Sequence, residues 1–111
     1  MVARIWRGYT TPENADAYEN FLKTEFLPAV ETKKIAGYKR FELLRKNNGD
    51  EISFITIMWF ESIEHIRSFA GEEYEKAVVH PKAQALLKRY DKTSEHYEIR
   101  HQLSYGSPQR T

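Results

Sequence analysis

The sequence predicts an α+β fold of the ferredoxin-like type, in which helices cover one face of a four-stranded antiparallel sheet. Two observations carry this prediction: the elements follow the order strand, helix, strand, strand, helix, strand, and a tight-turn signal joins the second and third strands. With 111 residues, of which 41% are hydrophobic and 14% aromatic, the chain is long enough for one such core. We expect the domain to span residues 1–103 and residues 104–111 to form a flexible tail.

The first strand and helix are predicted at the N-terminal end. Residues 2–9 mix β-branched and aromatic side chains with arginines, which is typical of a strand. Thr11, Pro12 and Glu13 then give a cap, a first-turn proline and a first-turn acid. Apolar residues follow at helical spacing, namely Ala15, Tyr18, Leu22, Phe26 and Ala29. Pro28 is expected to kink or end this helix.

A hairpin is predicted in the middle of the chain. Residues 38–46 form its first strand, residues 47–50 (Asn-Asn-Gly-Asp) its turn, and residues 51–60 its second strand. This second strand is apolar on both faces. One face carries Ile52, Phe54 and Met58, and the other carries Ile55, Ile57 and Trp59.

The second helical region begins after Ser62 and stops at Gly71, because serine caps helix starts and glycine tolerates the conformation that ends them. Residues 72–79 are expected to add a helical turn or two. Pro81 should open a last helix, and residues 93–103 should form the final strand. The apolar positions of that last helix are Ala83, Leu86, Leu87 and Tyr90.

The doubly apolar third strand predicts a homodimer. Helices on one face of the sheet leave the other face bare, and a bare face is normally polar. A second copy packed sheet to sheet would bury these residues. The alternative is that long side chains such as Arg40 and Arg100 shield them.

Composition excludes several classes of function. Lys and Arg number 17 against 16 Asp and Glu, and the two signs are interspersed, which argues against nucleic acid as a partner. There is no cysteine, hence no disulfide, thiolate metal site or iron–sulfur cluster. Four scattered histidines and no glycine-rich phosphate loop predict neither a metal nor a cofactor. No apolar run approaches the roughly 18 residues that span a bilayer, so we expect a cytoplasmic protein without a membrane partner.

Three segments resemble the antibiotic biosynthesis monooxygenase family of dimeric α+β barrel proteins. They are ARIW at 3–6, WFESIEHIRSFAG at 59–71 and HYE at 96–98. The resemblance implies a homodimer whose two sheets form a barrel, with a pocket between sheet and helices in each subunit. In some members of the family this pocket oxygenates aromatic substrates without flavin or metal, and other members of the fold degrade haem. In the haem-degrading relatives, the resemblance implies a site made of an asparagine on the first strand, a tryptophan in the second helical region and a histidine after it. In this sequence Phe69 stands near the tryptophan position and His80 near the histidine position, and the first strand has no asparagine.

Two histidines are candidate catalytic residues. His96 lies on the predicted last strand, where a side chain that titrates near neutral pH could accept a proton from a phenol. His80 precedes Pro81 and could serve as a pocket base or a ligand. The plainer alternatives are a surface strand histidine and a polar residue at a helix junction.

Five further residues are candidate substrate-binding residues: Arg4, Trp6, Trp59, Phe69 and Tyr74. Arg4 could stabilise a substrate anion in a pocket of low dielectric constant, or be an ordinary strand arginine. The two tryptophans could wall a flat ligand, or pack in the core or a dimer interface. Tyr74 lies on an apolar face, which favours a packing role, although its hydroxyl could orient a substrate.

Mainly through the resemblance, we expect a cofactor-independent monooxygenase that acts on a hydroxyaromatic or quinol-type small molecule with molecular oxygen. The alternative of another class is a non-catalytic small-molecule-binding or stress-associated barrel protein, which needs the same pocket and no base. A minor alternative is a haem-binding or haem-degrading relative that uses His80.

Overall fold

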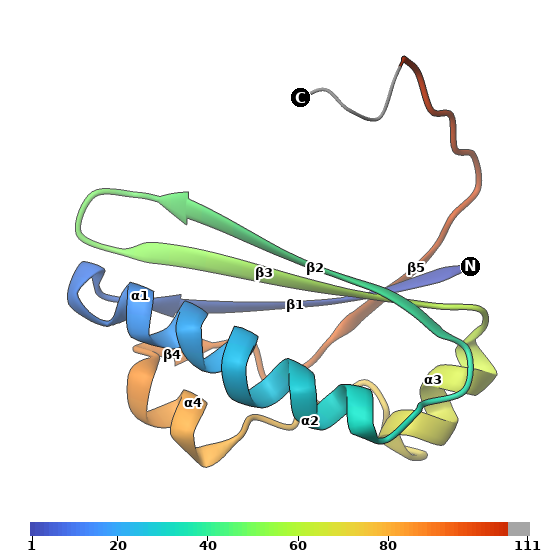
Figure 1. The fold of residues 1–111 in the computed structure, drawn as a ribbon, viewed down its shortest axis with the longest axis horizontal. Helices are drawn as coiled ribbons and strands as arrows, with labels where there is room; N and C mark the ends of the chain where they lie inside the picture. The colour runs from blue at the N-terminus through green and yellow to red at the C-terminus, as the bar shows by residue number, and fades with distance from the viewer. Residues whose placement is uncertain (107–111) are drawn as a thin grey trace.

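The computed structural model describes residues 1–106, which form one sheet with all the helices on one side of it (Figure 1). The elements in chain order are β1 (Val2–Thr10), α1 (Pro12–Phe21), a π-helical turn (Leu22–Phe26), α2 (Leu27–Thr32), β2 (Tyr38–Asn47), β3 (Ile52–Phe60), α3 (Ile63–Ala70), α4 (Pro81–Leu86), β4 (Arg89–Tyr90) and β5 (Glu95–Glu98). None of these helices is long and apolar enough to cross a membrane.

The sheet is antiparallel and confirms the predicted fold class. Its order is β2-β3-β1-β4, and β5 also pairs with β1. The two short strands occupy one edge of β1 in succession: β4 lies beside Gly8 and Tyr9, and β5 lies beside residues 2–5. They take the place of the single fourth strand that the sequence predicted.

The predicted final strand, 93–103, is therefore wrong in both its limits. Between β4 and β5 the backbone pairs with the loop after α3, because Ala77 donates to the carbonyl of Lys92 and Ser94 to that of Glu75. At the other end, Ile99 donates to the carbonyl of Met1, the first residue of the chain. The pairing of β5 with β1 ends at Glu98, opposite Val2.

The helical segment continues past Pro28 to Thr32, so this residue does not end the helix, one of the two outcomes that the sequence predicted for it. Thr11 caps the helix as expected, its hydroxyl accepting from the backbone N–H of Asn14. A π-helical turn precedes α2, and the N–H of Leu27 reaches back to the carbonyl of Leu22. Pro28 then lies in the first turn of α2. The change of hydrogen-bond register accommodates a residue that has no N–H.

The later helices are shorter than predicted. Ser62 caps α3 and Gly71 ends it at φ +92°, as expected. Residues 72–79 form turns rather than further helix, held by the backbone bonds to the segment before β5. The last helix stops at Leu86, because Leu87 is extended and the N–H of Lys88 joins the carbonyl of Tyr9.

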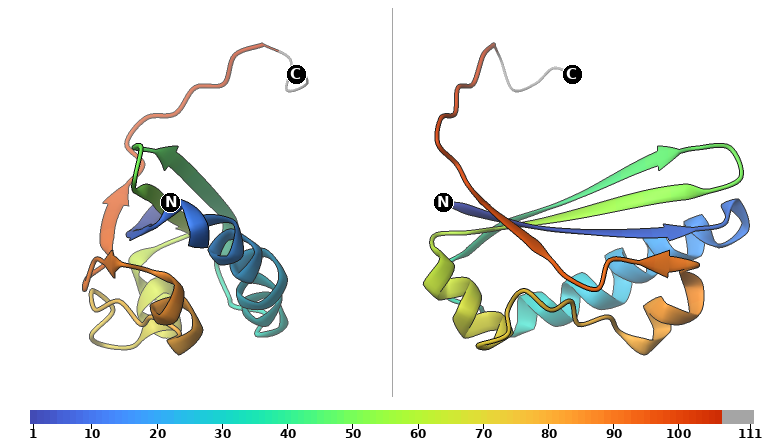
Figure 2. Two further views of the ribbon diagram at one scale, coloured as in Figure 1. Left: turned by 90° about the vertical axis from the view of Figure 1, so that its left-hand side faces the viewer. Right: turned by 180° about the vertical axis from the view of Figure 1, so that it is seen from behind.

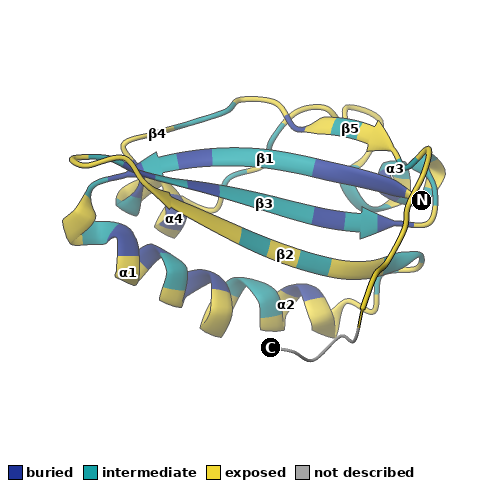
Figure 3. Ribbon diagram, turned by 90° about the horizontal axis from the view of Figure 1, so that it is seen from above, coloured by how far each residue is buried: buried dark blue, intermediate teal, exposed yellow. Residues whose placement is uncertain are grey.

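The core lies between the helices and the sheet, and the opposite face of the sheet carries no helix (Figures 2 and 3). Phe54 and Phe60 on β3 are fully buried against the helices, packing with Tyr18 and Ile66. The alternate residues of β3, Ile55, Ile57 and Trp59, point to the bare side, which we call the open face. Of the predicted tail, 104–111, residues 104–106 are exposed without regular structure, and 107–111 lie outside the described residues.

Gly37 is required at the entrance to β2. Its φ is +78°, and an added Cβ would lie 2.3 Å from Cγ of His65 on α3. Gly37→Ala is expected to lower the free energy of unfolding by about 2–4 kcal/mol, through backbone strain and through displacement of the imidazole. Urea unfolding measures this. Gly49→Ala is the matched control, since φ is +90° there with open space around it, and about 1–2 kcal/mol of strain is expected. Equal losses in both variants would contradict the account.

Candidate functional site

A cavity of about 290 Å³ lies between the sheet and the helical layer, and we call it the inner cavity. Its walls are mainly apolar, and six of its lining residues are aromatic: Trp6, Tyr18, Phe21, Phe26, Phe41 and Phe69. The basic residues in its walls are Arg4, Lys33 and His80, and no Asp or Glu of the described part of the chain lines it. A pocket of this kind suits a small, flat, electron-rich ligand.

Arg4 is the buried charge in this wall. Alternation along β1 turns its side chain toward the helices, where it is only 7% exposed. Its Nη1 donates to the carbonyl of Tyr74 at 2.5 Å and to Nε2 of His96 at 2.9 Å. Among the described residues, no carboxylate lies within ion-pair distance of it. Burial lowers the pKa of Arg4 below its ordinary value, since the charged form loses solvation.

His96 holds Arg4 from the neighbouring strand. The two residues are directly opposite each other in the β1–β5 register. Because arginine can only donate, Nε2 of His96 is the acceptor and the proton of the neutral ring is on Nδ1. Burial, and then the charge of Arg4, lower the pKa of His96, with Glu75 opposing. The neutral ring is therefore favoured, which keeps its acceptor available to Arg4.

His96 and Tyr74 line a second depression rather than the inner cavity. The two rings meet edge to face at 5.1 Å. They belong to an open groove of about 940 Å³ near the chain's N-terminus, which we call the outer groove. Arg4 thus connects the two spaces: it lines the inner cavity and bonds to two residues of the outer groove.

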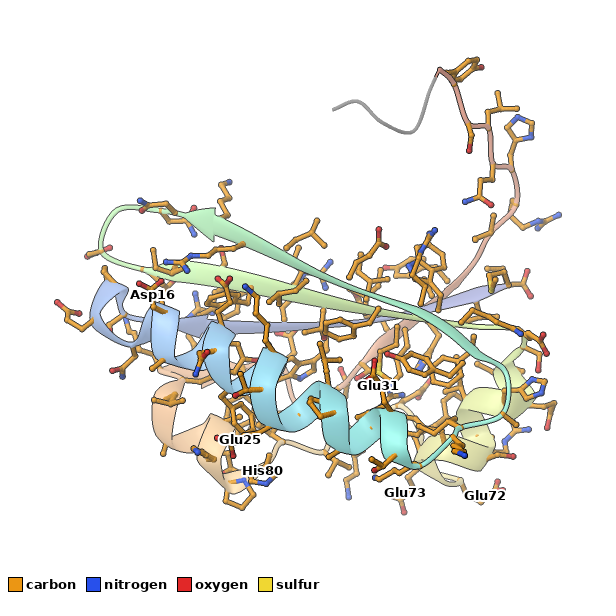
Figure 4. All side chains as sticks on the ribbon, in the orientation of Figure 1. Asp16, Glu25, Glu31, Glu72, Glu73 and His80 are labelled. Atoms are coloured by element: carbon orange, nitrogen blue, oxygen red, sulfur yellow. The ribbon has the colours of Figure 1, made fainter. Side chains whose placement is uncertain are left out.

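His80 is an exposed residue on the rim of the inner cavity. It caps α4, with Nδ1 accepting from the backbone N–H of Lys82 at 3.0 Å, and its ring centroid is 5.3 Å from that of Phe21. Figure 4 places it at the edge of the helical layer away from the sheet. The nitrogen left for a ligand is Nε2.

The tryptophans divide between the two faces of the sheet. Trp6 lines the inner cavity, and its indole N–H donates to the carbonyl of Asp91 at 2.7 Å. Trp59 lies on the open face, where its indole N–H donates to Glu42 at 2.6 Å and Arg40 stacks on its ring at 5.0 Å. The predicted site residues that the structure brings to the inner cavity are Arg4, Trp6, Phe69 and His80.

Sequence reasoning missed several residues of the inner cavity. Tyr18 and Phe26 were recognised only as an apolar helix stripe, and their position opposite Arg4's strand depends on how the helix crosses the sheet. Ser94, which is 6% exposed, lines both the inner cavity and the outer groove. Its place follows from the break between β4 and β5, which no local sequence signal indicated.

Comparison with known proteins identifies the fold. Solved structures match nearly the whole chain, among them the following three. A Bacillus cereus protein assigned to the antibiotic biosynthesis monooxygenases is 12% identical, with a TM-score of 0.63 over 96% of this chain and 97% of that one. The haem degrader MhuD from Mycobacterium tuberculosis, with two haems in its active site, is 19% identical, with a TM-score of 0.57 over 94% and 100%. SnoaB, a cofactor-independent oxygenase from Streptomyces nogalater, is 20% identical, with a TM-score of 0.54 over 94% and 97%.

The chain therefore has the α+β fold of the antibiotic biosynthesis monooxygenase-type proteins, as its sequence resemblance implied. No family model matches the sequence, and no curated protein does. At these identities the likeness establishes the fold alone, and the reaction has to be argued from the residues.

Proposed function

We propose that the protein is a cofactor-independent monooxygenase that oxidises a hydroxyaromatic or quinol-type molecule in the inner cavity. The observation that carries the proposal is a buried arginine, without a carboxylate partner among the described residues, in the wall of an aromatic cavity. Electrostatic stabilisation of a substrate anion is the main requirement of such a reaction, because the ionised aromatic ring itself passes electrons to oxygen.

The reaction balances without an external reductant. A phenol that gains one oxygen atom and loses two hydrogens becomes a quinone, and the second oxygen atom leaves as water. Arg4 would stabilise the phenolate, and His80 at the rim would exchange the proton, for which it must release the N–H of Lys82. His96 would keep the guanidinium in place. The aromatic walls would exclude bulk water from the reacting ring.

The proposal includes a homodimer formed through the open face. Apolar residues occupy this face on every long strand: Ile5 and Tyr9 on β1, Leu44 on β2, and Ile55, Ile57 and Trp59 on β3. Arg40 stacks on the ring of Trp59 and Arg89 on that of Tyr9, so the shielding that the sequence left open as an alternative is partial. A second copy packed against this sheet would bury the remainder.

Oxygen uptake by metal-free protein tests the activity, with dihydroxyaromatic, anthrone-like and quinol substrates. Uptake is expected to require the folded protein and to fall about tenfold or more in His80→Gln, because proton exchange at the rim is lost. His101→Gln is the matched control, since His101 is exposed beyond β5 and lines neither space. Uptake equal to that of heat-denatured protein with every substrate would contradict the proposal, and retained ligand binding would then identify a binding protein.

A further inference from the structure

Among residues 1–106, the charge of Arg4 has no counter-ion. Surface arginines of this chain reach carboxylates, such as Arg7 with Glu95 at 2.7 Å and Arg45 with Asp16 at 2.8 Å. Arg4 is more than nine-tenths buried and has only a neutral carbonyl and a neutral imidazole as partners among the described residues. A buried charge without an opposite charge destabilises a fold, so a ligand that supplies the missing charge gains binding energy by relieving this cost.

The donors of Arg4 that remain free fit a carboxylate. Both hydrogen bonds of the guanidinium to described residues come from Nη1. This leaves Nε and Nη2 on the adjoining edge. Two parallel N–H groups on one edge of a guanidinium match the two oxygens of a carboxylate, and such bidentate pairs are among the strongest hydrogen bonds in proteins.

The rest of the cavity wall favours an anion as well. No Asp or Glu among residues 1–106 lines the inner cavity, and Lys33 and His80 are its other basic residues. The acidic side chains lie instead along the outer groove, which includes Glu61, Glu75 and Glu95. The charged residues that line the inner cavity are therefore basic, whereas those that line the outer groove are mainly acidic.

We infer that the ligand of the inner cavity is an aromatic carboxylate, whose carboxylate binds the free edge of Arg4 while its ring fills the aromatic part of the cavity. A neutral phenol, with a pKa of about 10, would leave Arg4 uncompensated on binding, whereas a carboxylic acid, with a pKa of about 4, arrives ionised at neutral pH. The inference deepens the proposed function, on which it relies for the inner cavity being the substrate site, by specifying a hydroxyaromatic acid as the substrate class.

Calorimetric titration with two matched probes tests the inference: 1-hydroxy-2-naphthoate and its neutral analogue 1-hydroxy-2-naphthamide. The carboxylate is expected to bind the wild-type protein about 10- to 100-fold more tightly than the amide, the range for a charge-assisted hydrogen-bonded pair. Arg4→Gln should abolish this preference. Arg4→Lys should retain part of it, because lysine keeps the positive charge but cannot make the bidentate hydrogen bonds of the guanidinium. Arg45→Gln, which removes an ion-paired surface arginine, should leave the preference unchanged.

Three results would overturn the inference: equal affinities for the two probes, a preference that persists in both Arg4 variants, or no binding of the carboxylate. Oxygen uptake separates this failure from failure of the proposed function. A carboxylate that binds through Arg4 and consumes no oxygen would refute the oxygenase and leave the inference standing. If the protein oxidises neutral hydroxyaromatics and does not bind the carboxylate, the inference is refuted and the proposed oxygenase activity stands.

Discussion

Arg4→Gln is expected to lower the rate of oxygen uptake by about 10²-fold, because glutamine cannot balance the charge of a substrate anion in the aromatic cavity. The same change should leave the melting temperature unchanged or raise it, since it removes a buried charge that has no carboxylate partner among the described residues. Oxygen-electrode rates and thermal unfolding of the same preparations measure the two effects. A residue that served only the fold would lose activity and stability together.

The control for this variant is Arg45→Gln, whose guanidinium lies on the surface with Asp16 and Glu19. Its rate should stay close to that of the wild type. If Arg4→Gln keeps the wild-type rate, or if its melting temperature falls as steeply as its rate, Arg4 has no electrostatic role in the reaction.

Ile57→Lys is expected to convert a dimer into a monomer. Ile57 lies on the open face of β3, directly opposite Ile5 on β1, in the middle of the three long strands. A lysine there would bury an unpaired charge between the two sheets, which should raise the dissociation constant of the dimer at least about 100-fold. Sedimentation equilibrium should show twice the 13.1 kDa chain mass for the wild type and the single mass for the variant.

Ala17→Lys is the matched control for the dimer. Ala17 is exposed on α1, on the side of the molecule away from the open face, so the same charge is added outside the proposed interface. This variant should remain dimeric. A monomeric wild type, or an Ile57→Lys protein with the wild-type mass, would contradict a dimer formed through the open face.

The sequence predicted the parts of the fold that local chemistry determines. Helix caps such as Thr11 and Ser62, the glycine at the end of α3 and the alternation in β3 each follow from one segment of chain, and the structure confirms them. The errors arose where distant segments compete for the same backbone groups. Residues 92–94 pair with the loop after α3 instead of with β1. The sequence of neither segment indicates that the two pair with each other.

The site was predictable in its composition and less so in its arrangement. Strand alternation puts Arg4 and Trp6 on one face of β1, but only the structure shows that this face turns toward the helices and that Trp59 lies on the open face. The position of His96 could not be derived in the same way. Its face depends on the register between β5 and β1, which places it opposite Arg4 and beside the outer groove. That Arg4 has no carboxylate partner among the described residues could not be predicted from the sequence, because it depends on the positions of all the side chains around the guanidinium.

A crystal structure of the protein with 1-hydroxy-2-naphthoate tests the central claim, that the inner cavity with Arg4 is the ligand site, most directly. The account predicts the naphthalene ring inside the inner cavity and the carboxylate within hydrogen-bond distance of the Arg4 guanidinium. A ligand bound in the outer groove or on the open face, with the inner cavity empty, would contradict it.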